Sequence, residues 1–398
     1  MPPILRALES RNYRIYFAGQ LISLAGTWMQ QVAMVWLAYR LTGSALVLGV
    51  VGFASQIPIL VFSAIGGVIT DRFDKRRLLL ATQALSMVQA LGLAALAWQG
   101  SATPAHLIAL AFGLGLINAL DVPTRQAIAV QLVDNKADLP NAIALNSFLM
   151  NAARFVGPSL AGFVVALAGE AVCFLLNGLS YLAVLLALLA IRLPAGEARK
   201  PPAPPLQALR EGLAYAAGQA EIRASLLLVA TTSFLAAPYV VLMPLFAREI
   251  FGGDARLYGL LLGCSGAGSL LGSAYLASRQ DTTGLTRKVA LAAPAVGVCV
   301  ALFALSPALW MAVPVLLALG LTIIVTVAGS NTLIQTRVDN ALRARVVALI
   351  TMAFLGGAPL GSFVVGSLAH AAGVRPTLVL CGLLTVAAGL AYRRRTAD

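Results

Sequence analysis

Apolar runs long enough to cross a lipid bilayer recur along the whole chain. About 20 apolar residues span the hydrocarbon core as an α-helix, and runs near this length alternate with short charged or Gly/Pro-containing stretches. We predict spans near residues 16–39, 45–69, 78–98, 105–131, 141–168 and 171–192, then near 224–247, 257–278, 289–305, 309–335, 344–370 and 375–392. The pattern predicts an all-α integral membrane protein with twelve transmembrane helices in two six-helix bundles.

A change of composition separates the sixth predicted span from the seventh. Residues 199–205 contain two basic residues and four prolines, which cannot form a helix interior. Leu206, Leu209 and Leu213 then recur at helical spacing with charged residues on the other faces, as in an amphipathic helix at a membrane surface. We therefore expect an N-terminal bundle over 1–193, a cytoplasmic linker over 194–222 and a C-terminal bundle over 223–398.

The loop charges predict the orientation of the chain. With a cytoplasmic N-terminus, Arg40, Arg248, Arg256 and Arg375 lie outside, two arginines lie within spans, and the remaining 22 of the 28 basic residues face the cytoplasm. Cytoplasmic loops of membrane proteins carry such an excess of Lys and Arg. Both termini are therefore expected in the cytoplasm.

Composition narrows the class of protein further. The chain is 60% hydrophobic and 11% charged, whereas soluble domains carry roughly 25% charged residues. The net charge of +13 is spread over loops between apolar runs rather than gathered as nucleic-acid binders gather it. The four cysteines and two histidines lack metal-site spacing. We expect no nucleic-acid partner, no metal and no cofactor.

An internal repeat relates the two halves. Residues 127–135 align with 332–340 at an offset of 205 and share Val-Asp-Asn, and 144–169 align with 348–373 at an offset of 204. Chance similarity between Ala/Leu/Gly-rich helices is the alternative. Because the offset matches the length of six spans, we interpret the repeat as a duplication with parallel halves.

The loop after the second span carries a specific motif. It reads Gly66-Gly67-Val-Ile-Thr-Asp71-Arg72-Phe-Asp74-Lys75-Arg76-Arg77, and it resembles the loop signature of the major facilitator superfamily. The resemblance implies that Asp71 latches the inner helix ends, with Arg125 as its candidate partner, and that Gly67, Arg72 and Arg76 belong to the same latch. The corresponding loop of the second half has Leu276 in place of the acid, so a second latch is not expected.

The fifth span contains Arg154-Phe-Val-Gly157-Pro158-Ser-Leu-Ala-Gly162, which is similar to a Gly-Pro motif of exporters in the same superfamily. Glycines permit close helix approach, and proline removes a backbone hydrogen bond. We expect Gly157, Pro158 and Gly162 to form a conformational pivot. Ordinary small-residue packing is the alternative.

A wider stretch, residues 117–193 together with 18–23 in the first span, resembles the branch that contains enterobactin and macrolide exporters. The resemblance implies a monomeric transporter in the bacterial inner membrane that moves an amphipathic drug or siderophore by alternating access. An importer or a lipid or lysolipid transporter of the same fold remains an alternative.

Charged residues inside the spans are the first candidates for coupling. Asp121 is the one acid well inside a predicted span, and an ionised group there is costly unless it is paired or hydrated. It shares a helical face with Arg125, and Arg154 lies at a similar depth. We consider a structural i,i+4 pair of Asp121 with Arg125 and a proton-carrying site in which Asp121 pairs with Arg154.

Polar residues elsewhere in the spans are candidates for lining a substrate cavity. They are Gln20, Thr27, Gln31, Ser147, Asn151, Tyr239, Asn331 and Gln335. The chain lacks a G-x-x-x-x-G-K-[ST] phosphate loop, so the expected energy source is an ion gradient or the gradient of the cargo itself. Our first interpretation is an exporter coupled to protons. A membrane receptor or enzyme without transport would need a large soluble domain, and the predicted loops are short. We expect no enzyme activity.

Overall fold

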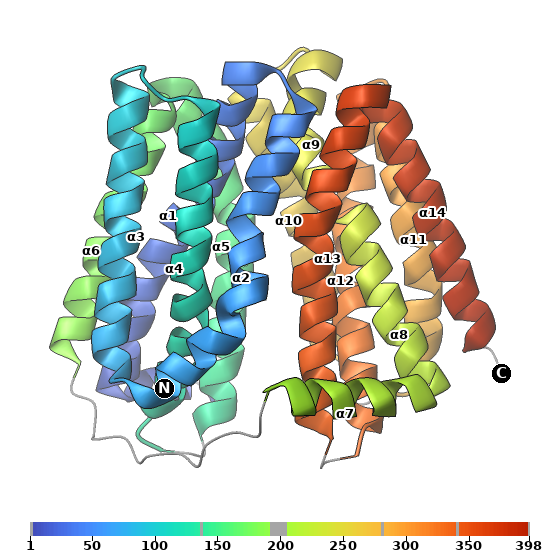
Figure 1. Cartoon of the computed structure of the whole chain (residues 1–398), viewed down its shortest axis with the longest axis horizontal. Coiled ribbons are helices and arrows are strands. Elements are labelled where there is room, and N and C mark those ends of the chain that lie inside the picture. The colour runs from blue at the N-terminus through green and yellow to red at the C-terminus, as the bar shows by residue number, and fades with distance from the viewer. Residues whose placement is uncertain (1–2, 136–137, 192–204, 280–281, 340–341, 397–398) are drawn as a thin grey trace. The chain divides into compact units, whose positions relative to one another are not determined.

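The computed structural model describes residues 3–135, 138–191, 205–279, 282–339 and 342–396. Within these residues, twelve helical segments are long and apolar enough to cross a membrane, which confirms the predicted number of spans. Figure 1 shows these segments running side by side within each half of the chain. The structure is all-helical, as the apolar pattern predicts.

The helices of the first half follow the predicted spans, and the first helix is longer than predicted at both ends. After a short 3₁₀ segment, η1 (Pro3–Glu9), they are α1 (Arg11–Thr42), α2 (Ala45–Arg72), α3 (Lys75–Trp98), α4 (Pro104–Gln131), α5 (Leu139–Ala168) and α6 (Glu170–Ala190). The second half contains α7 (Pro205–Gly218), α8 (Ala220–Thr231), η3 (Thr232–Ala236), α9 (Tyr239–Leu245), η4 (Phe246–Ile250), α10 (Ala255–Ala277), α11 (Leu285–Leu305), α12 (Leu309–Arg337), α13 (Arg343–Ala372) and α14 (Val374–Arg395).

The seventh span differs from the single regular helix that we predicted. It comprises α8, the π-helical turn η3, α9 and a second π-helical turn, η4. Pro238 follows η3 and Pro244 lies near the end of α9. Because proline lacks a backbone N–H, the i→i−4 hydrogen-bond ladder is interrupted there, and π turns are a common way for a helix to continue past such a break.

The described residues form two compact units. Unit 1 comprises those among 1–41 and 54–200, and unit 2 comprises those among 42–53 and 201–398. The grouping of 42–53 with unit 2 was not anticipated from the sequence. In unit 2, the start of α2 approaches α13 so closely that a Cβ atom on Gly49 would lie 2.5 Å from the backbone oxygen of Ser362.

Helix bounds support the internal repeat. Helices α4 and α12 begin 205 residues apart, at Pro104 and Leu309, and α5 and α13 begin and end 204 residues apart. The turns that follow α5 and α13 are both made by a glycine with positive φ, 81° at Gly169 and 91° at Gly373. Such a turn favours glycine because side chains with a Cβ atom rarely adopt positive φ.

Helix α7 packs on the rest of unit 2, lying crosswise at the helix ends in Figure 1. Glu211 forms an ion pair with Arg345 at the start of α13, and a Cβ atom on Gly212 would lie 3.3 Å from Cβ of Arg345. Ala216 is buried in a cluster with residues of α8, α12 and α13, whereas Leu213 is 53% exposed. The amphipathic helix that we predicted is present, and it is docked by its Gly212–Ala216 side; the side chains of Leu206 and Leu209 lie outside the described residues.

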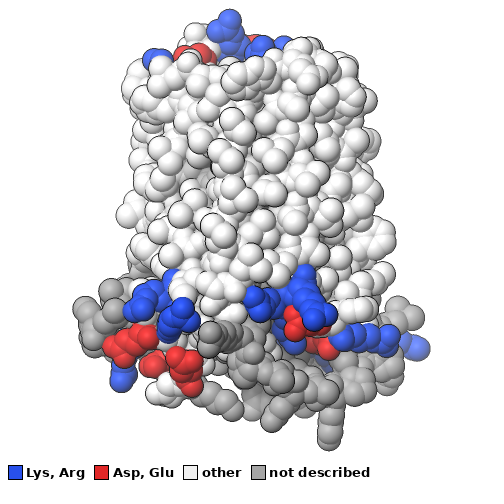
Figure 2. Space-filling model, turned by 90° about the vertical axis from the view of Figure 1, so that its left-hand side faces the viewer, with Lys and Arg blue, Asp and Glu red and all other residues white. Residues whose placement is uncertain are grey.

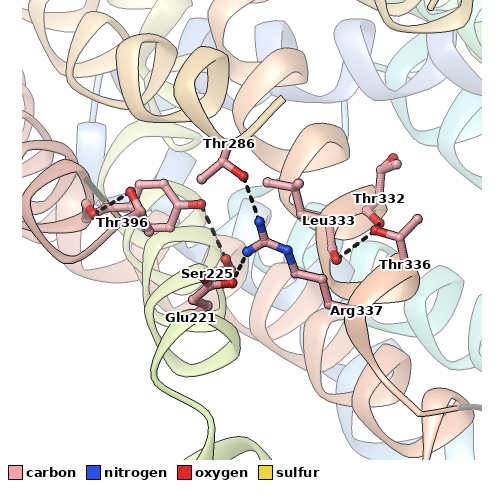
Figure 3. Close-up of polar contacts among 9 residues, drawn as sticks. Glu221, Ser225, Thr286, Thr332, Leu333, Thr336, Arg337 and Thr396 are labelled. Atoms are coloured by element: carbon pink, nitrogen blue, oxygen red, sulfur yellow. Dashed lines mark hydrogen bonds and ion pairs between the residues drawn. The ribbon is translucent and has the colours of Figure 1, made fainter. Parts of the chain in front are cut away.

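Arg337 connects three helices at one end of unit 2 (Figure 3). It forms an ion pair with Glu221 of α8, and its second guanidinium nitrogen donates to the Thr286 hydroxyl of α11, 3.0 Å away. Nearby, the Ser225 hydroxyl lies 3.5 Å from that of Tyr392 on α14. These contacts tie together the ends of α8, α11, α12 and α14.

On one face of the protein, the charged side chains gather toward the ends of the helices. On the face drawn in Figure 2, the described Lys, Arg, Asp and Glu residues gather at two ends, and the surface between them is uncharged. Large apolar side chains such as Phe163 and Leu167 are 60% and 71% exposed. A wide uncharged and apolar surface is what a bilayer requires of a protein that spans it.

Candidate functional site

Asp121 of α4 is 2% exposed and is held by three side chains. The hydroxyl of Thr82 and the amide nitrogen of Gln83, both on α3, donate to Oδ1 at 2.8 and 2.7 Å. A guanidinium nitrogen of Arg125, one turn further along α4, lies 3.1 Å from Oδ2. A buried charge is tolerated when it is paired and its remaining lone pairs accept hydrogen bonds, and these contacts meet both conditions.

Helices α2 and α4 pack closely against each other next to this ion pair. The hydroxyls of Thr70 on α2 and Thr124 on α4 lie 2.7 Å apart and are buried. One turn before Thr70, a Cβ atom on Gly66 would lie 2.1 Å from the backbone oxygen of Ala119, so only glycine permits this approach of α2 to α4.

Three buried polar atoms near the ion pair have no hydrogen-bond partner among the described residues. They are the Tyr16 hydroxyl, Nε2 of Gln20 and Oε1 of Gln83. Tyr16 and Gln20 are one turn apart on α1, and Gln83 is the residue whose amide nitrogen donates to Asp121. Buried polar atoms are normally satisfied. These three atoms therefore have unused donor or acceptor capacity.

Arg154 of α5 lies beside an aromatic side chain of α1. Its guanidinium carbon lies 5.4 Å from the ring centroid of Trp28 on α1, a cation–π distance. A Cβ atom on Gly157 would lie 2.5 Å from Cβ of Trp28, so the glycine of the Gly-Pro motif permits this packing of α5 on α1. Asp121 forms its ion pair with Arg125, four residues further along α4.

Other predicted cavity residues are scattered through the two units. Gln31 is exposed, the Thr27 hydroxyl donates to the backbone oxygen of Ser23 at 2.9 Å, and Tyr239 hydrogen-bonds to Ser265 in the core of unit 2. Asn331 and Gln335 contact each other, with 3.1 Å between Gln335 Nε2 and Asn331 Oδ1. The side chains of Ser147 and Asn151 lie outside the described residues.

A buried polar network in unit 1 escaped the sequence analysis. Gln30 Nε2 donates to Oε1 of Gln89 at 2.9 Å, and Asn177 Nδ2 donates to Oε1 of Gln30 at 2.8 Å. Gln89 in turn donates to the backbone oxygen of Leu110 at 3.1 Å. The network links α1, α3, α6 and α4. The sequence signal was the series Tyr16, Gln20, Ser23, Thr27 and Gln30 at helical spacing on α1.

The loop motif has more than one local role. Asp74 caps α3 by accepting a hydrogen bond from the backbone nitrogen of Arg77 at 2.7 Å. Arg76 donates to the backbone oxygens of Leu188 and Leu189, at 2.6 and 2.9 Å, in the last turn of α6, where cations stabilise a helix. Asp71 and Arg72 are exposed.

The proposed latch partner of Asp71, Arg125, contacts Asp121 in the structure. Of the two adjacent glycines in the motif, Gly66 makes the close contact; nothing lies within 4 Å of a Cβ atom on Gly67. In the pivot motif, Gly157 and Pro158 are buried.

The positions that correspond to the ion pair in the second half are uncharged. Thr326 and Ser330 follow Asp121 and Arg125 by 205 residues, the offset that relates α4 to α12. Both are fully buried, and their hydroxyls have no hydrogen-bond partner among the described residues. Polarity is thus present at this depth in both halves, whereas the charges are in the first half.

Comparisons with known proteins identify the family. The family described as transmembrane secretion effector matches residues 4–397. The chain is 26% identical to a staphyloferrin A transporter of Staphylococcus aureus over 379 residues, covering 94% of this chain and 93% of that protein. It is 27% identical to the multidrug efflux pump Tap of Mycobacterium tuberculosis over 390 residues, with 95% and 91% covered.

Among solved structures, a bacterial homologue of the lysosomal transporter Spinster matches with a TM-score of 0.76 and 14% identity, covering 98% of this chain and 97% of that one. This likeness shows the fold of the major facilitator superfamily. The match to the family extends from the first helices to the last, and all twelve spans lie within it. The chain is therefore a multi-pass membrane transporter, not an enzyme, and belongs to the transmembrane secretion effector family of the major facilitator superfamily.

Proposed function

We propose that the protein is a proton-coupled exporter of amphipathic small molecules that works by alternating access. The observation that carries this proposal is Asp121, a buried carboxylate in a membrane helix with a basic partner and unpartnered polar atoms nearby. Intramembrane acids of this kind mark ion or proton pathways in transporters. The two relatives, a staphyloferrin A transporter and a multidrug efflux pump, support a small-molecule cargo.

Protonation of Asp121 would remove its charge and with it the attraction to Arg125. The Thr82 and Gln83 donors remain in place, so the neutral acid stays solvated by the protein while Arg125 is released. The Tyr16 hydroxyl and Gln83 Oε1 provide a donor and an acceptor through which a proton can approach. The proton favours one arrangement of the Asp121–Arg125 pair, and the cargo favours another. Because both shift the equilibrium between these two arrangements, binding of the proton and binding of the cargo are coupled.

We place the protein in the bacterial inner membrane as a monomer with both termini in the cytoplasm. Protons then enter as cargo leaves. Transport assayed in inverted membrane vesicles gives the direction: uptake into inverted vesicles on acidification of their lumen indicates export, whereas uptake into right-side-out vesicles indicates the importer alternative.

The test of coupling is Asp121→Asn in proteoliposomes. A screen of macrolides, catecholate siderophores and lysolipids by ligand-induced thermal stabilisation first supplies a cargo. We expect Asp121→Asn to abolish accumulation driven by a pH gradient while downhill exchange of cargo persists, because the amide preserves the shape of the site and cannot carry the proton.

Asp254→Asn is the matched control. Asp254 is exposed and caps α10, and asparagine caps a helix about as well as aspartate, so gradient-driven transport should be unchanged. If the ion pair is only structural, Asp121→Asn will lower the melting temperature, the double variant Asp121→Asn/Arg125→Gln will recover it, and both will keep gradient-driven transport. Gradient-driven transport by a folded Asp121→Asn variant would falsify the coupling role.

A further inference from the structure

The first residues of the chain pack on the end of α4 and the start of α5. Ala7 of η1 is fully buried, and its backbone nitrogen donates to Oδ1 of Asn141 on α5 at 3.0 Å. The Ser10 hydroxyl accepts from the backbone nitrogen of Asp134, just after α4, also at 3.0 Å. Residues 6–10 therefore bridge the ends of two helices of unit 1.

Helix α7 makes corresponding contacts in unit 2. The Tyr215 hydroxyl lies 3.5 Å from Oδ2 of Asp339, to which it donates, and Asp339 follows the end of α12 at Arg337. A Cβ atom on Gly212 would lie 3.3 Å from Cβ of Arg345 near the start of α13. Residues 211–216 therefore bridge the ends of α12 and α13.

The two sets of contacts join equivalent positions of the internal repeat. The offset of 205 relates α4 to α12, and the offset of 204 relates α5 to α13. With these offsets, two contacts of residues 6–10 coincide with two contacts of residues 211–216. The pairs are Ser10–Asp134 with Tyr215–Asp339, and Ala7–Asn141 with Gly212–Arg345. Residues 211–216 thus occupy the place in unit 2 that residues 6–10 occupy in unit 1.

An ion pair accompanies each set of contacts, with the signs of the charges exchanged. In unit 1 the base precedes the bundle, and Nε of Arg6 lies 3.9 Å from Oδ1 of Asp138. In unit 2 the acid does so, and Glu211 pairs with Arg345. Residues 6 and 211 correspond at the offset of 205, and each faces a residue of opposite charge. The attraction is therefore common to both halves, although the residues that supply it differ.

Apolar packing holds both segments at the same places. Each segment buries one alanine against the last turns of the fourth helix of its half and the first turns of the fifth. In unit 1 the cluster contains Ala7, Ile128, Leu132, Ala142 and Leu145. In unit 2 it contains Ala216, Ile334, Val338, Val346 and Leu349. The ion-paired side chains are partly exposed, and such pairs and single hydrogen bonds are individually weak, so these contacts can open and close.

We propose that each half of the transporter carries its own strap, residues 6–10 in unit 1 and 211–216 in unit 2. Each strap holds the end of the fourth helix of its half to the start of the fifth, and it must open whenever these two ends separate. The repeated unit then consists of a strap and six spans, so α7 belongs to the second repeat rather than to the linker. The straps are a conformational device that goes beyond the proposed coupling site at Asp121.

The experiment measures hydrogen–deuterium exchange of backbone amides, which reports local opening, in the purified full-length protein in lipid nanodiscs. Ser10→Ala removes the acceptor of the Asp134 amide. We expect peptides that contain Asp134 to exchange roughly two- to tenfold faster, the effect of one hydrogen bond, and peptides that contain Asp339 to be unchanged. Ser101→Ala, the same substitution at an exposed position in the loop after α3, should change neither.

Charge reversal tests the second strap. Glu211→Arg places two arginines together, so peptides that contain Asp339 should exchange faster while those that contain Asp134 do not. The double variant Glu211→Arg/Arg345→Glu restores opposite charges and should return exchange toward that of wild type.

Three results would overturn the proposal: unchanged exchange in Ser10→Ala, equal acceleration of both regions by either single variant, or a double variant that exchanges as fast as Glu211→Arg. Acceleration of both regions would indicate general loosening of the fold rather than a strap in each half. Because the assay contains neither cargo nor a pH gradient, its outcome is independent of proton coupling at Asp121.

Discussion

At the scale of single residues, the free energy of the candidate site depends on whether each buried charge and dipole has a partner. Asp121 accepts from two neutral donors and one guanidinium, and loss of one partner from a buried ion pair costs about 3–5 kcal/mol. The side chain of Arg125 is 22% exposed, so leaving Arg125 unpaired costs less than leaving Asp121 unpaired. We therefore expect some substitutions around the site to change the stability of the protein and others to change transport.

Adjacent glycines on α2 provide a sharp test of helix packing. We expect Gly66→Ala to lower the melting temperature, because its Cβ atom would lie 2.1 Å from the Ala119 backbone oxygen and α2 would have to move away; overpacking of this kind costs about 1–3 kcal/mol. Gly67→Ala meets nothing within 4 Å and should be neutral or slightly stabilising. Thermal unfolding in detergent measures both, and equal melting temperatures for the two variants would contradict the packing of α2 on α4.

Adjacent glutamines on α1 test the buried network in the same way. Gln30→Leu removes the partner of both Gln89 and Asn177, and side-chain hydrogen bonds between membrane helices contribute roughly 0.6 kcal/mol each, at most about 1.7. We expect a measurable loss of stability in urea or thermal unfolding. Gln31→Leu, at an exposed position, should show none; a loss of stability confined to Gln31→Leu would mean that α1 is rotated from the orientation described.

At the scale of helices, the apolar runs were enough to predict the spans, because crossing a bilayer requires both a minimum length and low charge. The break in the seventh span was not predicted, although Pro238 and Pro244 are visible in the sequence, since a proline can be absorbed by a kink as well as by a π turn. Asp121 could be found as an acid within a span. Thr82 and Gln83 could not, because their contact with Asp121 depends on how α3 is rotated against α4.

Helix α7 is held against the rest of unit 2 by contacts that a single substitution can break. We expect Gly212→Leu to release α7, because a side chain there would collide with Arg345, whose Cβ atom and backbone oxygen lie 3.3 and 3.4 Å from the position of a Cβ atom. Release would expose the helix to trypsin, which cleaves after Arg210. Gly218→Leu is the control, since nothing lies within 4 Å of its Cβ position. Equal cleavage of both variants and wild type would argue against docking through Gly212.

At the scale of the whole molecule, the distribution of loop charges predicts which loops face the cytoplasm. In a variant without the four native cysteines, Ser101→Cys in the loop after α3 should react with a membrane-impermeant maleimide in intact cells. Thr282→Cys, in the loop after α10, should react only after permeabilisation. Both positions are exposed, so accessibility reports the side of the membrane, and the opposite labelling pattern would invert the proposed topology.

The uncharged pair Thr326 and Ser330 also bears on the history of the chain. On our interpretation of the internal repeat as a duplication, the two halves began with the same residues at these positions. One half now carries an acid and a base, and the other carries two hydroxyls. The symmetry that relates the backbone of α4 to that of α12 therefore does not extend to the charges: a protein assembled from two first halves would place a second acid and a second base where the present chain has neither.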